Sequence, residues 1–283
     1  MFKLQKFLLV LAGFVSVSWL YGLPEGTTPI SGGGTFSVLE NVMTIDAPNN
    51  SIFEHQHFNV ATSETVRFVQ PDSNSRVLNR ILSNTPSLVN GSIIANGKVY
   101  FASPGGLIFG EGSAVDVGFL HAIGGKLSDE NFLNSFYSYE QLTGSIENHG
   151  LINAREVILA GNRVINSGQI SARSGDIALA VGTGVTIQSF DGSLAIQVSP
   201  GNEIENIIAS DFAGQAVLQS GIIESARTRI HADAIEQTGT IKANEVMFSD
   251  FSHLESQGEI QSSAVTKLSP RNISSGSNAK LTN

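Results

Sequence analysis

Carboxylates are the first candidates for chemistry, because polysaccharide cleavage needs two or three acids held on one face. Glu147, Glu236 and Glu255 occupy the same position of a sequence repeat described below, but Glu147 is remote from the other two. The outward positions that follow the repeat glycines place no acids on neighbouring repeats. A solvated surface explains the two neighbouring glutamates, and we expect no catalytic residue and no enzymatic activity.

Two histidines could form part of a metal site. His55 and His57 alternate along a predicted strand, which places both imidazoles on one face. A zinc site needs further ligands, and the neighbouring Glu54 alternates to the opposite face of the strand. The chain contains no cysteine, which excludes disulfides and thiolate ligands. We therefore expect no metal and no cofactor, and interpret the histidines as part of a half-exposed strand.

Two arginines could bind an anion. Arg155 and Arg173 occupy equivalent positions of adjacent repeats, so they are predicted to lie one above the other. Guanidinium groups bind carboxylate and sulfate groups through paired hydrogen bonds. The pair could therefore contact an acidic glycan; the alternative interpretation is a solvated surface pair.

These side chains must be positioned by a repeat in the C-terminal half of the chain. Five segments share a Gly-x-Ile core, and their glycines are separated by 18, 53, 18 and 19 residues. We interpret the interval of 53 as about three periods. The segments are Ile146-Glu-Asn-His-Gly150-Leu-Ile152, Val164-Ile-Asn-Ser-Gly168-Gln-Ile170, Val217-Leu-Gln-Ser-Gly221-Ile-Ile223, Ile235-Glu-Gln-Thr-Gly239-Thr-Ile241 and Leu254-Glu-Ser-Gln-Gly258-Glu-Ile260. A fixed period of this length is typical of a solenoid.

The aligned columns of the repeat predict how each coil packs. Apolar residues precede each glycine by four positions and isoleucine follows it by two, so both columns should point inward and stack. A polar column, two positions before the glycine, could form a ladder of bonded side chains along the axis: Asn148, Asn166, Gln219, Gln237 and Ser256. The glycines would supply a positive φ or permit a tight corner. The pattern predicts an all-β, single-stranded parallel β-helix.

The ends of the chain differ from this repeat. Residues 1–22 have a basic start followed by an apolar run, which is typical of a cleaved secretory signal peptide and predicts export. Residues 23–70 are interpreted as an N-terminal β cap with the first strands, and residues 71–268 as the β-helix. The polar segment 269–283 is predicted to be a disordered tail. The net charge of −9 argues against nucleic acid as a partner.

One excursion interrupts the β-helix at residues 125–143. Ser128 could cap a short helix there, with two acids in its first turn. Phe132, Leu133 and Phe136 would form the buried face of this helix.

Residues 52–123 carry an ordered series of motifs. The series comprises Ile52-Phe-Glu-His-Gln-His-Phe58, Glu64-Thr-Val-Arg-Phe68, Leu78-Asn79-Arg80-Ile81, Pro86-Ser-Leu-Val-Asn-Gly91, Ala95-Asn-Gly97-Lys-Val99, Pro104-Gly-Gly-Leu-Ile-Phe-Gly110 and Val115-Asp-Val-Gly-Phe-Leu120. In this order they resemble the secretion domain of two-partner secretion exoproteins of the filamentous haemagglutinin type. The resemblance covers roughly residues 23–265.

The resemblance implies a right-handed β-helix with an N-terminal cap, exported through the Sec machinery. An outer-membrane transporter of the two-partner type would recognise it in the periplasm and pass it to the cell surface or the medium. The match to the family's Asn-Arg and Asn-Pro-Asn-Gly motifs implies that Asn79, Arg80, Pro104 and Gly106 take part in this recognition. The implied role is that of a non-enzymatic adhesin component, with a host receptor or a glycan as a further partner.

Two other classes remain open at this point. A stand-alone β-helix that binds or cleaves polysaccharide would need a groove lined with stacked acids or aromatic side chains. The single tryptophan, Trp19, lies in the predicted signal peptide, which counts against sugar stacking. A subunit that assembles edge to edge into a fibre would use an uncapped C-terminal coil.

Overall fold

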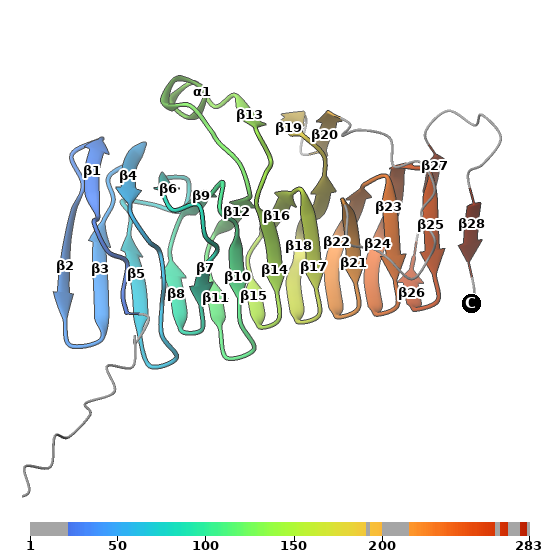
Figure 1. The fold of residues 1–283 in the computed structure, drawn as a ribbon, viewed down its shortest axis with the longest axis horizontal. Coiled ribbons are helices and arrows are strands. Elements are labelled where there is room, and N and C mark those ends of the chain that lie inside the picture. Colours follow the sequence, from blue (N-terminus) through green and yellow to red (C-terminus); the bar gives the residue numbers. More distant parts are fainter. Residues whose placement is uncertain (1–21, 191–192, 200–214, 264–266, 271–277, 282–283) are drawn as a thin grey trace, which may run out of the picture.

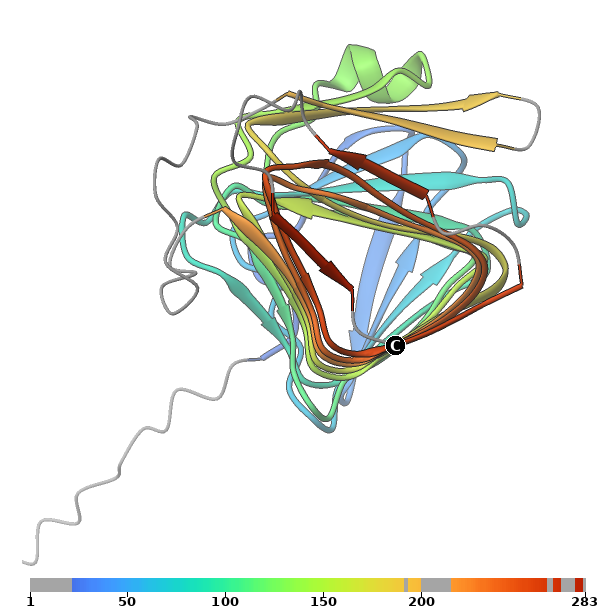
Figure 2. The same ribbon diagram turned by 90° about the vertical axis from the view of Figure 1, so that its right-hand side faces the viewer.

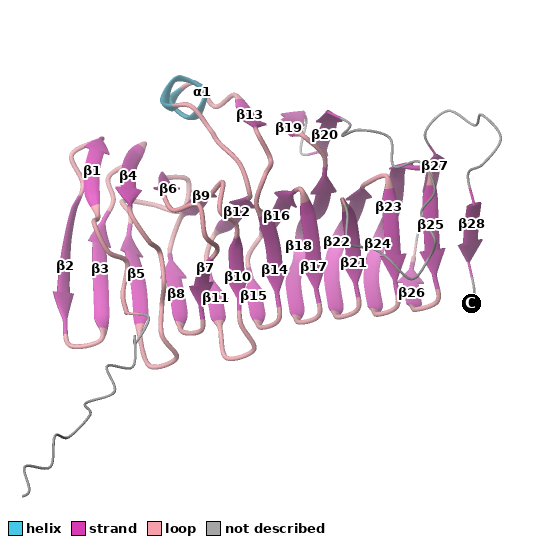
Figure 3. Cartoon of the chain, viewed as in Figure 1, coloured by secondary structure: helices cyan, strands magenta, loops and turns pink. Residues whose placement is uncertain are grey.

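The chain forms an elongated solenoid with a three-sided cross-section (Figures 1 and 2). The structure is a computed structural model and describes residues 22–190, 193–199, 215–263, 267–270 and 278–281. Successive strands follow the sequence along the long axis, and the strands of each face pair in parallel across coils (Figure 3). The parallel β-helix predicted from the repeat is confirmed. The predicted signal peptide lies outside the described residues, except for Gly22.

The first face is an eight-stranded parallel sheet. Its strands, in order along the axis, are β7 (Ser87–Val89), β10 (Leu107–Phe109), β14 (Ser145–Asn148), β17 (Arg163–Asn166), β21 (Ala216–Gln219), β23 (Ala234–Gln237), β25 (His253–Ser256) and β28 (Asn278–Leu281).

The other two faces are joined into one sheet by three long strands that bend around their common corner. The second face contains β3 (Val42–Asp46), β5 (Thr65–Val69), β8 (Ser92–Ala95), β11 (Ala114–Asp116), β15 (Leu151–Asn153) and β26 (Glu259–Ser262). The third contains β4 (Ser51–His55), β6 (Arg76–Ile81), β9 (Lys98–Ala102), β12 (Phe119–Ile123), β16 (Glu156–Gly161) and β27 (Lys267–Pro270). The strands shared by both faces are β18 (Gln169–Val181), β22 (Ile222–His231) and β24 (Thr240–Phe251).

The predicted columns of the repeat lie inside the solenoid. The apolar residues before and after each glycine are buried in one continuous core, and only Ile260, in the last repeat, is partly buried. The polar column is buried as well and forms bonds between coils. Asn148 Nδ2 donates to Asn166 Oδ1 at 2.8 Å, and Asn166 Nδ2 donates to Gln219 Oε1 at 2.7 Å. These bonds pair polar groups inside an apolar core, where an unpaired one is costly, although Asn148 Oδ1 at the start of the ladder has no hydrogen-bond partner among the described residues.

The repeat glycines are required by close stacking and not by a special backbone conformation. None of the five has a positive φ, so of the two roles expected from the sequence, a positive φ is wrong and a tight corner is correct. A Cβ atom at Gly221 would overlap the carbonyl oxygen of Gly168, and one at Gly239 would overlap that of Gly221. The backbones of successive coils approach so closely at this corner that only a residue without a side chain fits.

The interval of 53 residues does not represent three coils. Val164 pairs directly with Val217, and Ile170 pairs with Ile223, so β17 and β21 belong to adjacent coils. The additional residues between them include an antiparallel hairpin, β19 (Gly184–Phe190) and β20 (Ser193–Ser199), which lies outside the third face (Figure 2). Counting periods from the sequence assumed an uninterrupted repeat, and the insertion happens to have nearly the length of two coils.

The ends of the solenoid also differ from the predicted boundaries. The added antiparallel strands of the cap are β1 (Thr28–Ser31) and β2 (Thr35–Leu39), which pair with β4 and β3. Because β3 and β4 already pair in parallel with β5 and β6, the coils begin well before residue 71. Within the predicted disordered tail, β28 pairs in parallel with β25. The open edge of a coil presents unpaired backbone groups, and these can pair with a strand of any composition.

The excursion forms the short helix predicted from its capping residue. Helix α1 spans Asp129–Leu133, and the Ser128 hydroxyl accepts a hydrogen bond from the Asn131 backbone N–H. Phe132 is buried as predicted, whereas Leu133 and Phe136 are exposed. The helix has little more than one turn, so only one of the three side chains can face the solenoid.

The excursion and the hairpin cover a second hydrophobic core on the outer side of the third face. This core contains Ile52, Leu78, Tyr100, Ala102, Ile123, Leu127, Phe132, Tyr139, Leu142, Ile158, Ala160, Ala178, Ala180, Val185, Ile187 and Leu194. Strand β13 (Tyr137–Glu140) pairs with β19, which joins the two insertions into one antiparallel sheet. The insertions are thus packed parts of the fold.

The close stacking at the glycine corner predicts the effect of adding one methyl group. We expect Gly239→Ala to lower the free energy of unfolding by about 1–3 kcal/mol, because the new Cβ would force neighbouring backbones apart. The neighbouring change Thr238→Ala, at an exposed position, should have little effect. Urea unfolding of both variants checks this, and equal midpoints would contradict the stacking argument.

Candidate functional site

A cleft beneath the helical excursion brings together two of the four residues predicted to recognise a partner. It has a volume of about 640 Å³ and is lined by Arg80, by Pro104 and by residues of the excursion. The ends of β6 and β9 and the residues that follow β12 form one wall, and α1 and β13 lie over them (Figure 1). The further lining residues include Leu82, Asn84, Ala102, Lys126, Leu127, Ser128, Asn131, Ser138, Glu140 and Thr143.

Arg80 connects the solenoid to the excursion. Its Nη1 donates to Glu54 Oε1 at 2.8 Å, and its Nη2 forms an ion pair with Asp129 at the start of α1. Partial burial acts to lower the pKa of Arg80, but the hydrogen bonds to Asp129 and Glu54 outweigh it and raise the pKa above its ordinary value. The guanidinium therefore stays charged and holds α1 against β4 and β6.

Two further contacts hold the excursion in place. His121 Nδ1 lies 2.9 Å from the Tyr139 hydroxyl, and Arg76 Nη1 donates to the Tyr137 hydroxyl at 2.7 Å. Burial raises the pKa of Tyr139 well above its ordinary value, so its hydroxyl remains protonated. These contacts, together with the second core, make the cleft a preformed feature of the third face.

Asn79 lies on the opposite side of β6 from Arg80 and points into the core. It is fully buried, and its Oδ1 is 3.1 Å from His55 Nε2. His55 Nδ1 is in turn 2.9 Å from the Thr27 hydroxyl, next to the first cap strand. This chain of contacts links the cap to the first two coils. Asn79 has no surface with which to contact a partner of the folded domain, because adjacent residues of a strand point to opposite faces.

His55 does not occupy the half-exposed strand expected for the histidine pair. It is fully buried against Phe53 and Phe58, whereas His57 is exposed. Burial lowers the pKa of His55 to about 4, and the hydrogen bond to Asn79 opposes this effect only in part. Within the described ranges, no group of three or more His, Asp or Glu side chains is arranged to hold a metal ion.

Pro104 and Gly106 belong to the same turn but have different roles. Pro104 is half-buried in the cleft wall, and its carbonyl accepts a hydrogen bond from Thr143 Oγ1 at 3.0 Å. Gly106 is buried with φ +95°, and a Cβ there would collide with the backbone of Ser145 in the next coil. Gly106 is therefore required by the fold, and Pro104 alone of the two contributes to the cleft surface.

Sequence reasoning missed the polar residues that the excursion adds to the cleft. Lys126 and Glu140 exchange two backbone hydrogen bonds, with N···O distances of 2.8 and 3.0 Å, which closes the excursion at its base. Both residues line the cleft. They lie outside the motifs of residues 52–123, and no periodicity within the excursion indicates where it folds back onto the solenoid.

Arg155 and Arg173 are brought together in a different groove, at the corner between the second and third faces. The groove has a volume of about 720 Å³, and Asn96, Gln169 and Ser171 also line it. Arg155 Nη2 donates to the Ser73 carbonyl at 3.2 Å. Arg173 forms an ion pair with Glu224 at 3.0 Å, although its side chain is 78% exposed.

The predicted glutamate pair is confirmed in position, since Glu236 and Glu255 are opposite one another in β23 and β25. Both belong to the outward side of the first face, and neither lines the cleft or the arginine groove.

In the portion of the chain that the structure describes, no helix has the length and apolar character needed to cross a membrane.

The buried His55 predicts a specific loss of stability in acid. Its pKa is about 4 in the fold against an ordinary 6.5, so between these values the unfolded chain binds more protons. The contribution is fully present above about pH 6.5 and is lost as the pH falls toward 4, by an amount on the order of 3 kcal/mol. The native chain should be more stable than His55→Gln at pH 6.5, and urea unfolding should show this difference decrease as the pH falls to 4. Parallel curves would contradict the burial of a neutral imidazole, and the exposed His57→Gln controls for removal of one histidine.

Comparison with known proteins agrees with this architecture. The profile of the TPS secretion domain family matches residues 22–267. A heme/hemopexin-binding protein of Haemophilus influenzae strain Rd is 30% identical over 215 residues, which is 71% of this chain and 23% of that protein. A second heme/hemopexin-binding protein of Haemophilus influenzae is 35% identical over 60 residues, which is 21% of this chain and 6% of that protein. The chain thus matches less than a quarter of the length of these relatives.

Two solved structures share the fold. The HMW1 secretion domain of Haemophilus influenzae superposes with a TM-score of 0.67 at 24% identity, covering 84% of this chain and 73% of that one. The filamentous hemagglutinin secretion domain gives a TM-score of 0.54 at 16% identity, covering 87% of this chain and all of that one. These identities support the fold alone. Together with the profile match over nearly all the described residues, they lead to one conclusion: the chain belongs to the TPS secretion domain family, the secretion domains of two-partner secretion exoproteins.

Proposed function

We propose that this chain directs the export of a non-enzymatic surface or secreted exoprotein and is recognised by an outer-membrane transporter of the two-partner type. The observation that carries the proposal is the family match, which extends over both the cap and the coils. The signal-like residues 1–22 support a route through the Sec machinery and the periplasm. The heme-related names belong to relatives of which this chain matches only a minor part, so we assign it export and not ligand capture.

The cleft beneath the excursion is the surface we propose for transporter recognition. Arg80 and Pro104, the two predicted residues with exposed surface there, lie at its wall, and Lys126 adds a second cation. Asn79 and Gly106 would influence export only through the fold, because both are buried. Variants of Arg80 and Pro104 would therefore affect recognition directly, whereas variants of Asn79 and Gly106 would affect it through folding, although all four residues belong to the same family motifs.

Export from a Gram-negative host, with and without the candidate transporter, tests this function. We expect the chain in the medium only when the transporter is present. Lys126→Glu should reduce export by about tenfold, because it reverses a charge at the cleft, where losing one charged contact costs about 1.5–3 kcal/mol. Lys242→Glu, an equivalent change on the distant second face, should export normally. Equal retention in the periplasm with and without the transporter would contradict the proposal.

A double substitution distinguishes folding from recognition at Asn79. Asn79→Leu alone leaves His55 Nε2 without its partner, whereas His55→Leu with Asn79→Leu replaces both buried polar groups by apolar ones, which is far less costly. If Asn79 acts through the fold, the double variant should recover both stability and export. A stable double variant that is not exported would instead assign recognition to Asn79.

A second candidate function is favoured by the groove that contains both predicted arginines. We propose that Arg155 and Arg173 bind an anionic glycan there, because each carries N–H groups beyond those used in its protein contacts. Gln169 and Ser171 would add uncharged hydrogen-bonding groups. The host receptor of an adhesin could supply such a glycan.

Titration with chondroitin sulfate oligosaccharides, followed by calorimetry, checks the second candidate. We expect Arg155→Gln with Arg173→Gln to weaken binding by at least about tenfold, because two charge-assisted contacts are lost. Lys242→Gln serves as a matched control for the loss of a surface cation. Binding that is equal in all three proteins, or absent from the native chain, would refute the glycan site.

A further inference from the structure

At the junction between β18 and β22, the fold must select which of the later coils stacks on β18. Residues 182–215 separate the end of β18 from the start of β21, so the chain connection does not oblige the next coil to stack directly. Loop closure entropy grows only slowly with length, and a connection of this size could also reach the coil after next.

The identity of the apolar side chains does not distinguish the two candidate neighbours either. Ile170 stacks on Ile223, and Ile241 in the following coil presents the same side chain at the same position. Stacking β24 on β18 would align the same apolar columns and the same glycine corner, although it would leave the coil of β21 and β22 outside the stack. Some other feature must distinguish the correct neighbour, because repeats this similar can pair in more than one order.

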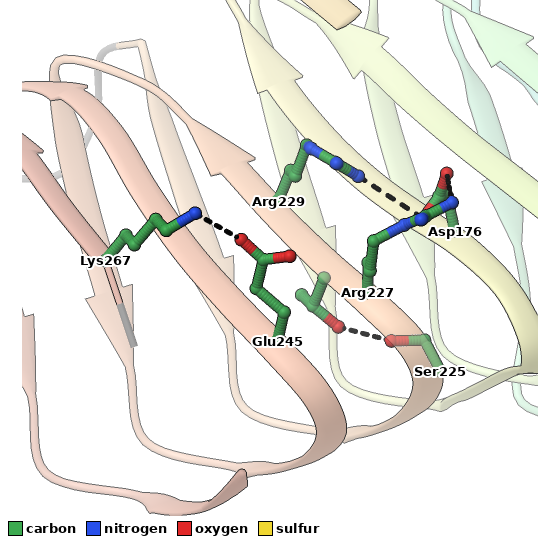
Figure 4. A network of polar contacts seen from close by, with 7 residues as sticks. Asp176, Ser225, Arg227, Arg229, Glu245 and Lys267 are labelled. Atoms are coloured by element: carbon green, nitrogen blue, oxygen red, sulfur yellow. Dashed lines mark hydrogen bonds and ion pairs between the residues drawn. The ribbon is translucent and has the colours of Figure 1, made fainter. Parts of the chain in front are cut away.

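A series of charges of alternating sign crosses four successive coils where the third face begins (Figure 4). Asp176 is the register partner of Arg227, and Arg227 is the register partner of Glu245. Glu245 Oε1 then forms an ion pair with Lys267 Nζ at 3.0 Å. We call Asp176, Arg227, Glu245 and Lys267 the charge ladder. Its signs alternate from coil to coil.

The ion pair between Asp176 and Arg227 is the first contact of the charge ladder, and it compensates a buried charge. Arg227 Nε and Nη2 donate to the two carboxylate oxygens of Asp176 at 2.6 and 3.0 Å, and Arg229 Nη1 adds a contact at 3.3 Å. Asp176 is only 5% exposed. A carboxylate at this depth needs its cations, because an uncompensated buried charge is strongly destabilising.

Asp176 and Arg227 are also the first residues at which β18 and β22 pair again after an irregular corner. Ala172 pairs with Ser225, but Asp176 pairs with Arg227, so β18 has two more residues at the corner than β22 (176 − 172 = 4 against 227 − 225 = 2). No such shift is present between β22 and β24, where Ser225 pairs with Ala243 and Arg227 with Glu245. The double hydrogen bond to Asp176 marks the position at which pairing resumes.

We propose that the charge ladder specifies the order of the coils by making β22, and not β24, the partner of β18. In the skipped order Glu245 would face Asp176, and like charges directly opposite one another on neighbouring strands repel. Met247, which pairs with Arg229, would take the place of the second cation. The wrong order is thus penalised by repulsion and by a buried carboxylate without partners, in addition to the exposure of core residues such as Ile223 and Ile230 in the skipped coil.

The absence of cysteine from the chain allows coil order to be measured directly. Gln169, Ile222 and Thr240 are successive register partners on the second face. Gln169→Cys with Ile222→Cys reports the native order, and Gln169→Cys with Thr240→Cys reports the skipped order. Each reporter is refolded from urea and mildly oxidised, and the disulfide yield is determined by proteolysis and mass spectrometry.

We expect the unmodified charge ladder to give the 169–222 disulfide. Adding Arg227→Glu and Glu245→Arg should lower the ratio of the 169–222 to the 169–240 product at least about tenfold, because the attractive and repulsive partners of Asp176 exchange places. Arg173→Glu with Glu224→Arg is the control: it reverses an ion pair at the same junction whose arginine is mostly exposed, and the ratio should not change.

A native 169–222 yield in the exchanged chain, with no 169–240 product, would overturn the proposal. If the exchanged chain does not refold, Asp176→Asn with Arg227→Gln and Glu245→Gln removes the charges and retains hydrogen-bonding groups. A mixture of both disulfides in this neutral variant would support the charge ladder as the determinant of order. Formation of the native disulfide alone would refute it.

Discussion

A single coil of this protein cannot bury its own apolar side chains, and every other feature depends on stacking coils at the spacing of paired strands, roughly 4.8 Å. At that spacing each column must contain side chains that tolerate their own kind directly above and below. Isoleucine and valine do so in the core, and buried amides do so by bonding to one another. At the glycine corner the backbones themselves are in contact, and a single methyl group is excluded.

Stacking defines the inner side of each strand and leaves the outer side free to vary. On the third face the outward residues of several coils are apolar, and Tyr100, Ile158 and Ala178 would be exposed without a cover. The excursion and the β19–β20 hairpin provide this cover and meet through β13. The cleft that we propose for partner recognition follows from the same arrangement, because it lies where the excursion rises from the coil ends.

Strand alternation also explains why a short sequence motif can combine two unrelated roles. Asn79 and Arg80 are neighbours in the chain, yet one is bonded to a buried histidine and the other is paired with acids at the surface. The interior position links the cap to the first coils, and the exterior position links the first coils to α1. A loss of export caused by changing this motif can therefore arise from either side of β6.

The sequence by itself determined the coil, because period, inward columns, polar ladder and the cap of α1 are local patterns with local physical causes. It did not determine which coils are neighbours across the interval of 53 residues, where the repeat begins, or that β28 pairs with β25. Arg80 and Pro104 could be named as candidates, but their shared cleft, the burial of Asn79 and the polar residues of the excursion could not. These features depend on contacts between segments far apart in the chain, whose energies come from pairing, burial and charge that exist only once the coils have stacked.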